Sequence, residues 1–256
     1  MTRAVRSAGV AELLWAAPGA PPQALGAVPL LLGEQPALAL TWAHAQQARA
    51  IAAAGTATLV LSEPRLSGPG WTPLAATGAV TLVEDGDGGL FAEQLLPQEL
   101  RKHPPSRALA DSPMLRREHW WYLPRLVLLL EPYEVLPVRP RQGPLDAVLA
   151  VAPGTDRLDV STVTVRDWAA AALELSGGPA EARGPAVLVG QELSVPDLER
   201  WTVHRTEGVY GDGRLTDVTP TGSRELEPVP GLLSRVRRHR ELERSCLRAL
   251  RAEGRT

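Results

Sequence analysis

Cysteine and lysine are almost missing from this chain of 256 residues. Cys246 is its only cysteine, so no disulfide can form within the chain and no site built from several cysteines can bind a metal. This scarcity favours a reducing, cytoplasmic compartment. Lys102 is the only lysine, in the unpromising context RKHPPS, and an enzyme that uses a Schiff base or a lysine general base would depend on it alone.

Long apolar runs and a surplus of basic charge are missing too. The run LVLLL at 126–130 is far below the ~20 residues that span a bilayer, so we expect no membrane association. Glu12 interrupts the apolar stretch that follows Arg3 and Arg6, which is more typical of a short amphipathic helix than of a secretion signal. The net charge of −2 and the pI near 6.2 argue against a nucleic-acid-binding surface.

Several common catalytic motifs are absent from the sequence: the P-loop, G-x-S-x-G, H-E-x-x-H and G-x-G-x-x-G. Nucleotide hydrolysis, α/β-hydrolase, zinc-protease and Rossmann functions therefore lose their usual support. The histidines, at 44, 103, 119, 204 and 239, show no paired spacing, and we expect no metal site.

A ββαββ pattern is present between Val28 and Asp85. Two strands are predicted at 28–33 and 37–42, joined by a tight turn at Gly33. An Ala-rich helix follows at 43–54 and ends at Gly55, the residue type expected just past a helix C-terminus. A buried strand, a Pro- and Gly-rich loop and a long strand complete the pattern, and Gly78 predicts a bulge in that last strand.

A fainter copy of this pattern runs from Asp146 to Leu215, with a helix predicted at 166–178. A short helix is predicted at 5–16 and a basic helix at 231–252. The chain is thus predicted to have a domain at 1–138, a Pro-rich linker at 139–144 and a second domain at 145–256. The predicted fold class is α+β and mainly antiparallel β: a split β-barrel with a second, degenerate barrel-like unit and a C-terminal helix. The alternative is that the repeat is accidental and that the second half is an unrelated α+β domain.

Residues 28–138 resemble the FMN-binding split β-barrel family, the pyridoxamine 5′-phosphate oxidase-like proteins. The resemblance rests on the order of elements, the helix pattern A-x-x-x-x-A-R-x-I and the strand pattern W-x-P-L-x-x-x-G-x-V. It implies a barrel that dimerises, with FMN in the cleft between two barrels and its phosphate held near the second strand and the following helix. The second unit would then supply an intramolecular pseudo-dimer in place of a homodimer.

The resemblance also implies site residues. Thr41, His44, Gln47 and Arg49 match the phosphate-binding region, and Trp71 would pack near the flavin ring. A helix N-terminus together with an Arg fork favours a phosphate dianion. The segment AHAQQAR carries one cation where family members usually carry an Arg- and Lys-rich run.

The segment LRREHWWYLPR at 115–125 is the densest cluster of chemical groups. His119 could act as an acid or base, Trp121 could stack on a flat ring and Arg125 could pair with an anion, so these three are the candidate substrate contacts. The same segment could instead pin a helix onto the barrel. The leading hypothesis is a cytoplasmic FMN-binding protein of a class that includes oxidoreductases acting on small molecules. The rival is a barrel pair without cofactor that acts as a binding or regulatory module.

Overall fold

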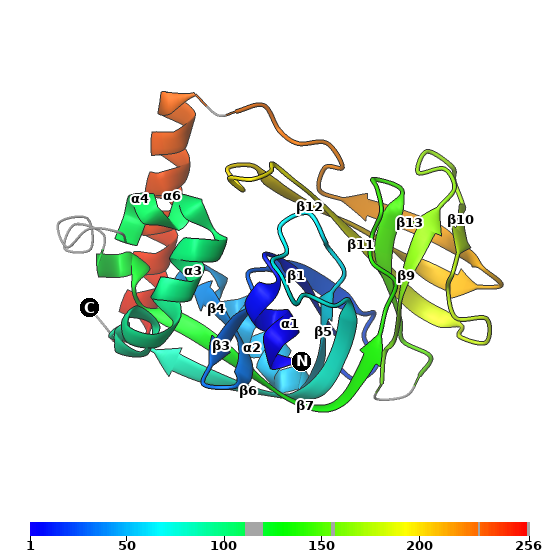
Figure 1. The fold of residues 1–256 in the computed structure, drawn as a ribbon, viewed down its shortest axis with the longest axis horizontal. Helices are drawn as coiled ribbons and strands as arrows, with labels where there is room; N and C mark the ends of the chain where they lie inside the picture. The colour runs from blue at the N-terminus through cyan, green and yellow to red at the C-terminus, as the bar shows by residue number, and fades with distance from the viewer. Residues whose placement is uncertain (111–119, 155–156, 230, 255–256) are drawn as a thin grey trace.

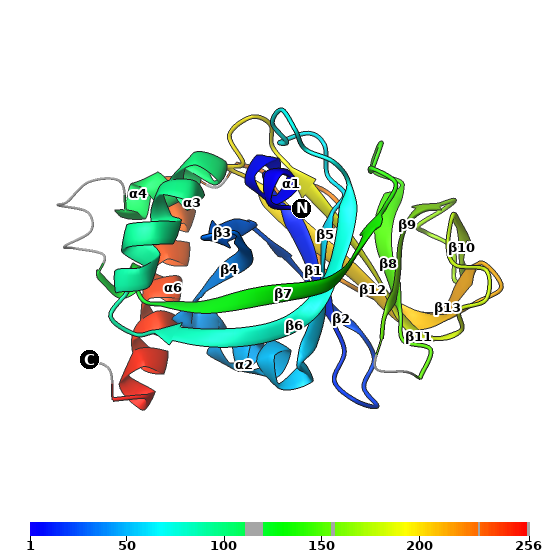
Figure 2. The ribbon, with the colours of Figure 1, turned by 60° about the horizontal axis from the view of Figure 1, so that its bottom comes forward.

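The protein consists of two antiparallel β units packed side by side, with helices at the far side of the first unit (Figures 1 and 2). The computed structural model describes residues 1–110, 120–154, 157–229 and 231–254. The fold is α+β and mainly antiparallel: a split-barrel unit, a second barrel-like unit and a C-terminal helix. The fold class predicted from the sequence is therefore confirmed.

The first unit, here called the first barrel, is a curled sheet in the order β2-β1-β5-β6-β7-β4-β3. Its strands are β1 (Ala11–Trp15), β2 (Gln23–Ala27), β3 (Leu30–Leu32), β4 (Gln35–Thr41), β5 (Thr56–Leu61), β6 (Leu74–Asp85) and β7 (Arg125–Pro137). All seven strands contribute side chains to one apolar core, which shows that the sheet curls around it.

Helical segments cover the ends of the first barrel. They are α1 (Thr2–Ser7), η1 (Trp42–His44), α2 (Ala45–Ala54), η2 (Phe91–Leu95), α3 (Leu96–Lys102), η3 (Pro104–Ser106), α4 (Arg107–Ala110) and η4 (Trp120–Tyr122). Gly55 ends α2 with φ of 73°, a left-handed conformation that glycine adopts without a steric penalty. The predicted helix end at Gly55 is confirmed.

The second unit, here called the second barrel, is closed, in the order β10-β13-β12-β11-β8-β9. Its strands are β8 (Asp146–Val151), β9 (Asp159–Val165), β10 (Leu173–Ser176), β11 (Gly184–Leu193), β12 (Trp201–Gly211) and β13 (Arg214–Thr221). Closure leaves the described part of this sheet without an edge strand, and its interior is filled by a separate apolar cluster.

The last helix, α6 (Leu232–Ala252), crosses back to the first barrel (Figure 1). Its residues Cys246 and Leu250 are fully buried in a cluster with Trp42, Leu96 and Trp121. The domain prediction assigned this helix to the second unit, whereas its apolar side packs on the first. Among the described residues, no helix is both long and apolar enough to cross a membrane.

The helix predicted at 5–16 is wrong beyond Ser7. Residues Ala11–Trp15 form β1, which pairs with both β2 and β5 and is buried on both faces. Leu13 and Trp15 point into the first barrel, while Leu14 points towards the second. A strand buried on both faces reads as a continuous apolar run, so its hydrophobic pattern does not alternate and can pass for a helix.

The helix predicted at 166–178 is also wrong. That segment contains turns and then β10, which pairs with β9 and β13 and closes the second barrel. Leu173 and Leu175 alternate into the barrel interior, as strand residues do. The run of four alanines before Leu173 has high helix propensity but offers no apolar stripe, and a short isolated helix is marginal. The second half therefore lacks the helix on which the predicted repeat depends.

Candidate functional site

The two barrels meet along a shared apolar layer between their outer faces. Strand side chains alternate between faces, so in β5 Leu59 points into the first barrel and Val60 towards the second. In β8, Leu149 points into the second barrel and Val148 towards the first. The buried members of the layer are Leu14, Ala24, Val60, Ala75, Val148, Ala150, Val187 and Val189.

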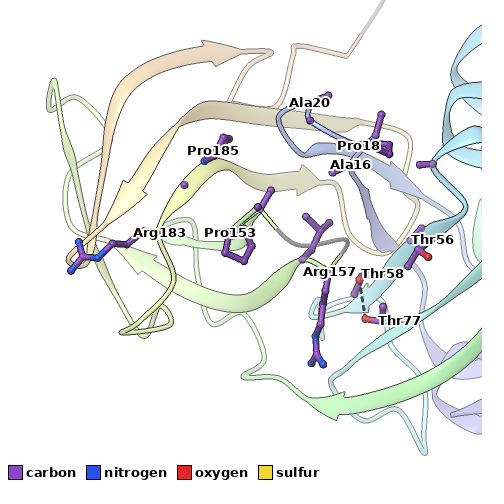
Figure 3. A pocket seen from close by; sticks show the side chains of 18 residues that line it. Ala16, Pro18, Ala20, Thr56, Thr58, Thr77, Pro153, Arg157, Arg183 and Pro185 are labelled. Atoms are coloured by element: carbon purple, nitrogen blue, oxygen red, sulfur yellow. Dashed lines mark hydrogen bonds between the residues drawn. The ribbon is translucent and has the colours of Figure 1, made fainter.

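At one end of this layer the strands open into a cleft of about 680 Å³, here called the interbarrel cleft (Figure 3). On the same faces of β5 and β6, two residues further along each strand, the side chains line the cleft. Thr58 lies two positions from Val60 in β5, and Thr77 lies two positions from Ala75 in β6. The lining residues are Ala16, Ala17, Pro18, Gly19, Ala20, Ala54, Thr56, Ala57, Thr58, Thr77, Ala152, Pro153, Gly154, Arg157, Leu158, Arg183, Gly184 and Pro185. Both barrels therefore build the cleft.

Two threonines form the polar part of the cleft wall. Thr58 of β5 and Thr77 of β6 are direct partners in the strand ladder, and their hydroxyl oxygens lie 2.9 Å apart. They are 1% and 7% exposed. The ladder shifts register immediately after Thr77, at Gly78, where a Cβ would overlap the carbonyl of Glu131. The predicted bulge at Gly78 is confirmed, and it bends β6 beside the cleft.

Two arginines lie at the rim of the cleft. Arg157 is 2.7 Å from Glu134, and Arg183 donates to Asp212 over 2.6 Å. Hydrogen bonding from Arg183 holds the pKa of Asp212 below its ordinary value. Figure 3 shows the guanidinium of Arg183 at the outer end of the site, away from the threonine pair. Both cations are thus matched by carboxylates, and the rim carries little net charge.

At the opposite end of the apolar layer the two barrels are joined by buried charges. Glu12 of β1, fully buried, accepts from Gln191 of β11 over 2.6 Å and lies 3.3 Å from Arg141. Arg141, in the connection between the barrels, also lies 2.8 Å from Glu63. We call Glu12, Glu63, Arg141 and Gln191 the interbarrel lock.

Burial acts to raise the pKa of both acids of the lock, but it decides the net shift only for Glu12. Burial raises the pKa of Glu12 above its ordinary value despite the opposing attraction of Arg141. For Glu63, burial also acts to raise the pKa, but hydrogen bonds from Arg65 and the charge of Arg141 outweigh it and the net shift is downward. A second cavity, of about 510 Å³, lies beside the lock and is bordered by Arg65 and Trp71. The charged groups of the lock pair with one another, although Nε of Arg141 has no hydrogen-bond partner among the described residues, and this pairing is the arrangement of a structural contact.

The predicted phosphate-binding residues lie at the α2 end of the first barrel. Thr41 ends β4, His44 is exposed just before α2, and Gln47 is half-buried in α2. Arg49 is committed elsewhere: its Nε and Nη2 donate to Glu84 over 3.0 and 2.9 Å, and its Nη1 donates to Glu253 over 2.8 Å. A phosphate there would have to displace two carboxylates.

Trp71, the predicted flavin contact, does not lie beside the predicted phosphate-binding residues at α2. β5 begins directly after α2 and ends before the loop that carries Trp71, and Figures 1 and 2 show that loop at the opposite end of β5 from α2. Six residues of strand span roughly 17 Å or more. Trp71 therefore does not lie beside the α2 residues, and FMN binding by these five residues stays a prediction.

The predicted substrate contacts are buried or lie outside the described residues. His119 lies outside them. Trp121 is 1% exposed and packs edge-to-face against His239 of α6, with ring centroids 5.4 Å apart. Arg125 is 1% exposed, and its guanidinium carbon lies 4.0 and 3.9 Å from the ring centroids of Phe91 and Tyr122. Trp121 and Arg125 thus serve packing, which agrees with the structural alternative for this segment.

The residues that line the interbarrel cleft were missed by sequence reasoning. Thr58 and Thr77 lie within predicted strands, and their only signal is that each is a polar residue among apolar neighbours. Arg157 and Arg183 follow Gly- and Pro-containing turns and carry no motif. Their proximity depends on the docking of two barrels, which no spacing in the sequence encodes.

Comparisons with known proteins give no family. No protein-family model matches the chain, and no curated protein matches it. A haem-binding protein from Mycobacterium smegmatis is similar in structure at 12% identity and a TM-score of 0.34, covering 97% of this chain and 95% of its own. A pyridoxamine 5′-phosphate oxidase-related, FMN-binding protein from Nostoc punctiforme is similar at 12% identity and a TM-score of 0.28, covering 86% and 87%. Likenesses of this strength establish neither a family nor a ligand for this chain.

Proposed function

We propose that this protein binds a small, largely apolar ring compound in the interbarrel cleft and does not itself catalyse a reaction there. The observation that carries the proposal is the cleft itself, about 680 Å³ and built from both barrels. Ligand sites typically have volumes of roughly 300 to 1,000 Å³ and are lined mainly by apolar groups. Alanine, proline, glycine and leucine supply most of this lining, and β5 and β6 give the cleft a flat strand wall that favours a flat ring.

Binding is favoured over catalysis by the chemistry of the lining. General acid–base catalysis needs a group that exchanges protons near neutral pH, and nucleophilic catalysis needs an activated nucleophile. The lining residues that the structure describes include no carboxylate, histidine, cysteine or lysine. The two arginines are ion-paired at the rim, and the described lining offers no general base that could activate a threonine hydroxyl.

The proposal favours the cofactor-free barrel pair over the FMN-dependent oxidoreductase. The support is the commitment of Arg49 to Glu84 and Glu253, together with the separation of Trp71 from the α2 residues. FMN could still enter the interbarrel cleft as a flat ring compound, but its phosphate would then meet Arg157 or Arg183 in place of Arg49.

Spectroscopy and a blocked cleft test this proposal. We expect the purified protein to be colourless and to gain thermal stability with at least one of riboflavin, FMN, FAD and haemin. Ala20→Trp, at the cleft wall, should abolish that gain, whereas Ala50→Trp, at an exposed position of α2 outside the cleft, should preserve it. Protein that carries flavin as purified and releases FMN on heating would contradict the cofactor-free proposal. The cleft assignment fails if no compound of the panel binds, or if Ala20→Trp binds it unchanged.

A further inference from the structure

The threonine pair in the cleft has one more hydrogen-bond donor than it uses. Two hydroxyl groups carry two protons, and the bond between Thr58 and Thr77 uses one of them. The other hydroxyl keeps its proton, and neither side chain makes a second hydrogen bond within the described residues. Whichever threonine donates inside the pair, the other has a donor left over.

The position of the pair makes this spare donor significant. Both threonines are at least nine-tenths buried, and both line the interbarrel cleft. A buried donor without an acceptor is unfavourable, so the spare hydroxyl favours a partner that enters the cleft, and a ligand that accepts its proton takes the place of water there. The strand register holds the two hydroxyls opposite each other, and a Cβ at Gly78, next to Thr77, would overlap the backbone of Glu131.

The surroundings define the kind of acceptor. No cationic side chain other than the rim arginines belongs to the described lining, and both of these are paired with carboxylates. A charged carboxylate or phosphate at the threonine pair would therefore be desolvated without a counter-charge. A neutral carbonyl oxygen can accept the hydroxyl proton without that penalty.

We infer that the ligand of the interbarrel cleft is a flat ring compound with a neutral carbonyl oxygen on the ring edge that faces Thr58 and Thr77. This oxygen accepts a hydrogen bond from the threonine pair. This inference rests on the proposed function, since it concerns the same cleft. Ring amides and ring imides, such as the pyrimidine end of a flavin ring, have this chemistry.

A matched pair of probes tests the inference. Lumichrome has two ring carbonyls, whereas phenazine has the same three-ring size and none. Affinity for both is measured by fluorescence or calorimetry on the full chain. We expect lumichrome to bind about threefold to tenfold more tightly than phenazine, the range of one hydrogen bond.

The variants separate the two hydroxyls. Thr58→Val and Thr77→Val each leave one hydroxyl with its proton, so both should keep the preference for lumichrome. The double variant, which replaces the pair by two side chains of the same shape, should lose it while phenazine binds as before. Thr56→Val, at the same strand face but without a hydrogen bond to the pair, is the control and should keep the preference.

The outcomes distinguish this inference from the proposed function. Equal binding of the two probes by the unchanged protein would overturn the inference. So would a preference that survives in the double variant, or one that is lost in Thr56→Val. In each of these cases the cleft still binds a ring compound and the proposed function stands. If neither probe binds, the inference is overturned, and the proposed function is wrong as well if riboflavin, FMN, FAD and haemin also fail to bind. Circular dichroism and thermal melting establish that the double variant is folded.

Discussion

His204 is a buried imidazole, and its burial keeps it unprotonated at neutral pH. Its ring is 5% exposed and packs edge-to-face against Trp168, with ring centroids 5.2 Å apart. Its partner across the strand ladder is Gly190, where a Cβ would overlap the ring. Neither ring nitrogen has a hydrogen-bond partner within the described residues. Burial lowers the pKa of His204 to about 4, so the imidazole is neutral at neutral pH.

Protonation of His204 should therefore destabilise the protein in mild acid. The unfolded chain binds this proton below its ordinary pKa of 6.5, whereas the folded protein binds it only below about 4. Stability is lost as pH falls through that window, by about 3 kcal/mol in total. His204→Phe keeps a ring over Gly190 but cannot be protonated, so its stability should fall less between pH 7 and pH 4. The measurement is urea unfolding of both proteins at each pH, and equal losses would contradict the assignment.

At the residue scale, the contacts of the predicted site residues could not be read from the sequence. Arg49 was correctly recognised as the one cation in its segment, but its partners Glu84 and Glu253 lie 35 and 204 positions away. Arg125 was recognised as part of a dense chemical cluster, yet only the structure shows it enclosed by Phe91 and Tyr122. Composition reports which chemistry a segment carries. Whether that chemistry faces solvent or a carboxylate depends on contacts that local sequence does not encode.

At the scale of elements, prediction succeeded where the signal was local. The turn at Gly33 and the helix end at Gly55 follow from a left-handed backbone that glycine adopts easily, and the bulge at Gly78 follows from the close approach of the β7 backbone. The order of elements from 28 to 85 is confirmed. The failures at 5–16 and 166–178 share a cause. Each segment becomes a strand because distant strands are available to pair with it, and pairing overrides intrinsic helix propensity.

The bulge at Gly78 gives a sharp test at this scale. Gly78→Ala should destabilise the protein by about 2 to 3 kcal/mol, because the added methyl would overlap the backbone of Glu131 and Pro132 in β7. Gly143→Ala is the control, since nothing lies within 4 Å of a Cβ there and its stability should change by less than about 0.5 kcal/mol. Chemical denaturation measures both. If Gly78→Ala is as stable as Gly143→Ala, the bulge is not sterically required.

The whole molecule depends on a docked interface with three zones: the lock, the apolar layer and the interbarrel cleft. All three zones lie on the outward faces of the same strands. In β1 and the residue after it, Glu12 belongs to the lock, Leu14 to the apolar layer and Ala16 to the cleft, at intervals of two residues. The connection between barrels is part of the interface, because the backbone N–H of Arg141 donates to Ser62 over 2.8 Å. The segment predicted as a linker at 139–144 thus contains a buried side chain that holds the two barrels in register.

Removing Arg141 should loosen this interface strongly. Arg141→Met would leave the carboxylate of Glu12 buried without a counter-charge and that of Glu63 with Arg65 alone, at a cost of about 3 to 5 kcal/mol in the free energy of unfolding. Arg166→Met removes an exposed ion pair with Glu174 and should cost less than about 1 kcal/mol. Limited proteolysis near 139–144 should increase for Arg141→Met and not for Arg166→Met.

The sign of the pH effect distinguishes a lost charge from lost packing. Without Arg141, the folded protein favours the protonated form of Glu12 even more than it already does, because burial is then opposed less. A group whose folded pKa is raised above its unfolded value adds stability as pH falls, so Arg141→Met should recover part of its loss between pH 7 and pH 5.

Adding Glu12→Gln to Arg141→Met should recover part of the loss already at pH 7, because the buried charge is gone. A loss that neither acid nor Glu12→Gln reduces would show that Arg141 contributes through its packed side chain, and the lock would then be a steric contact in place of an electrostatic one.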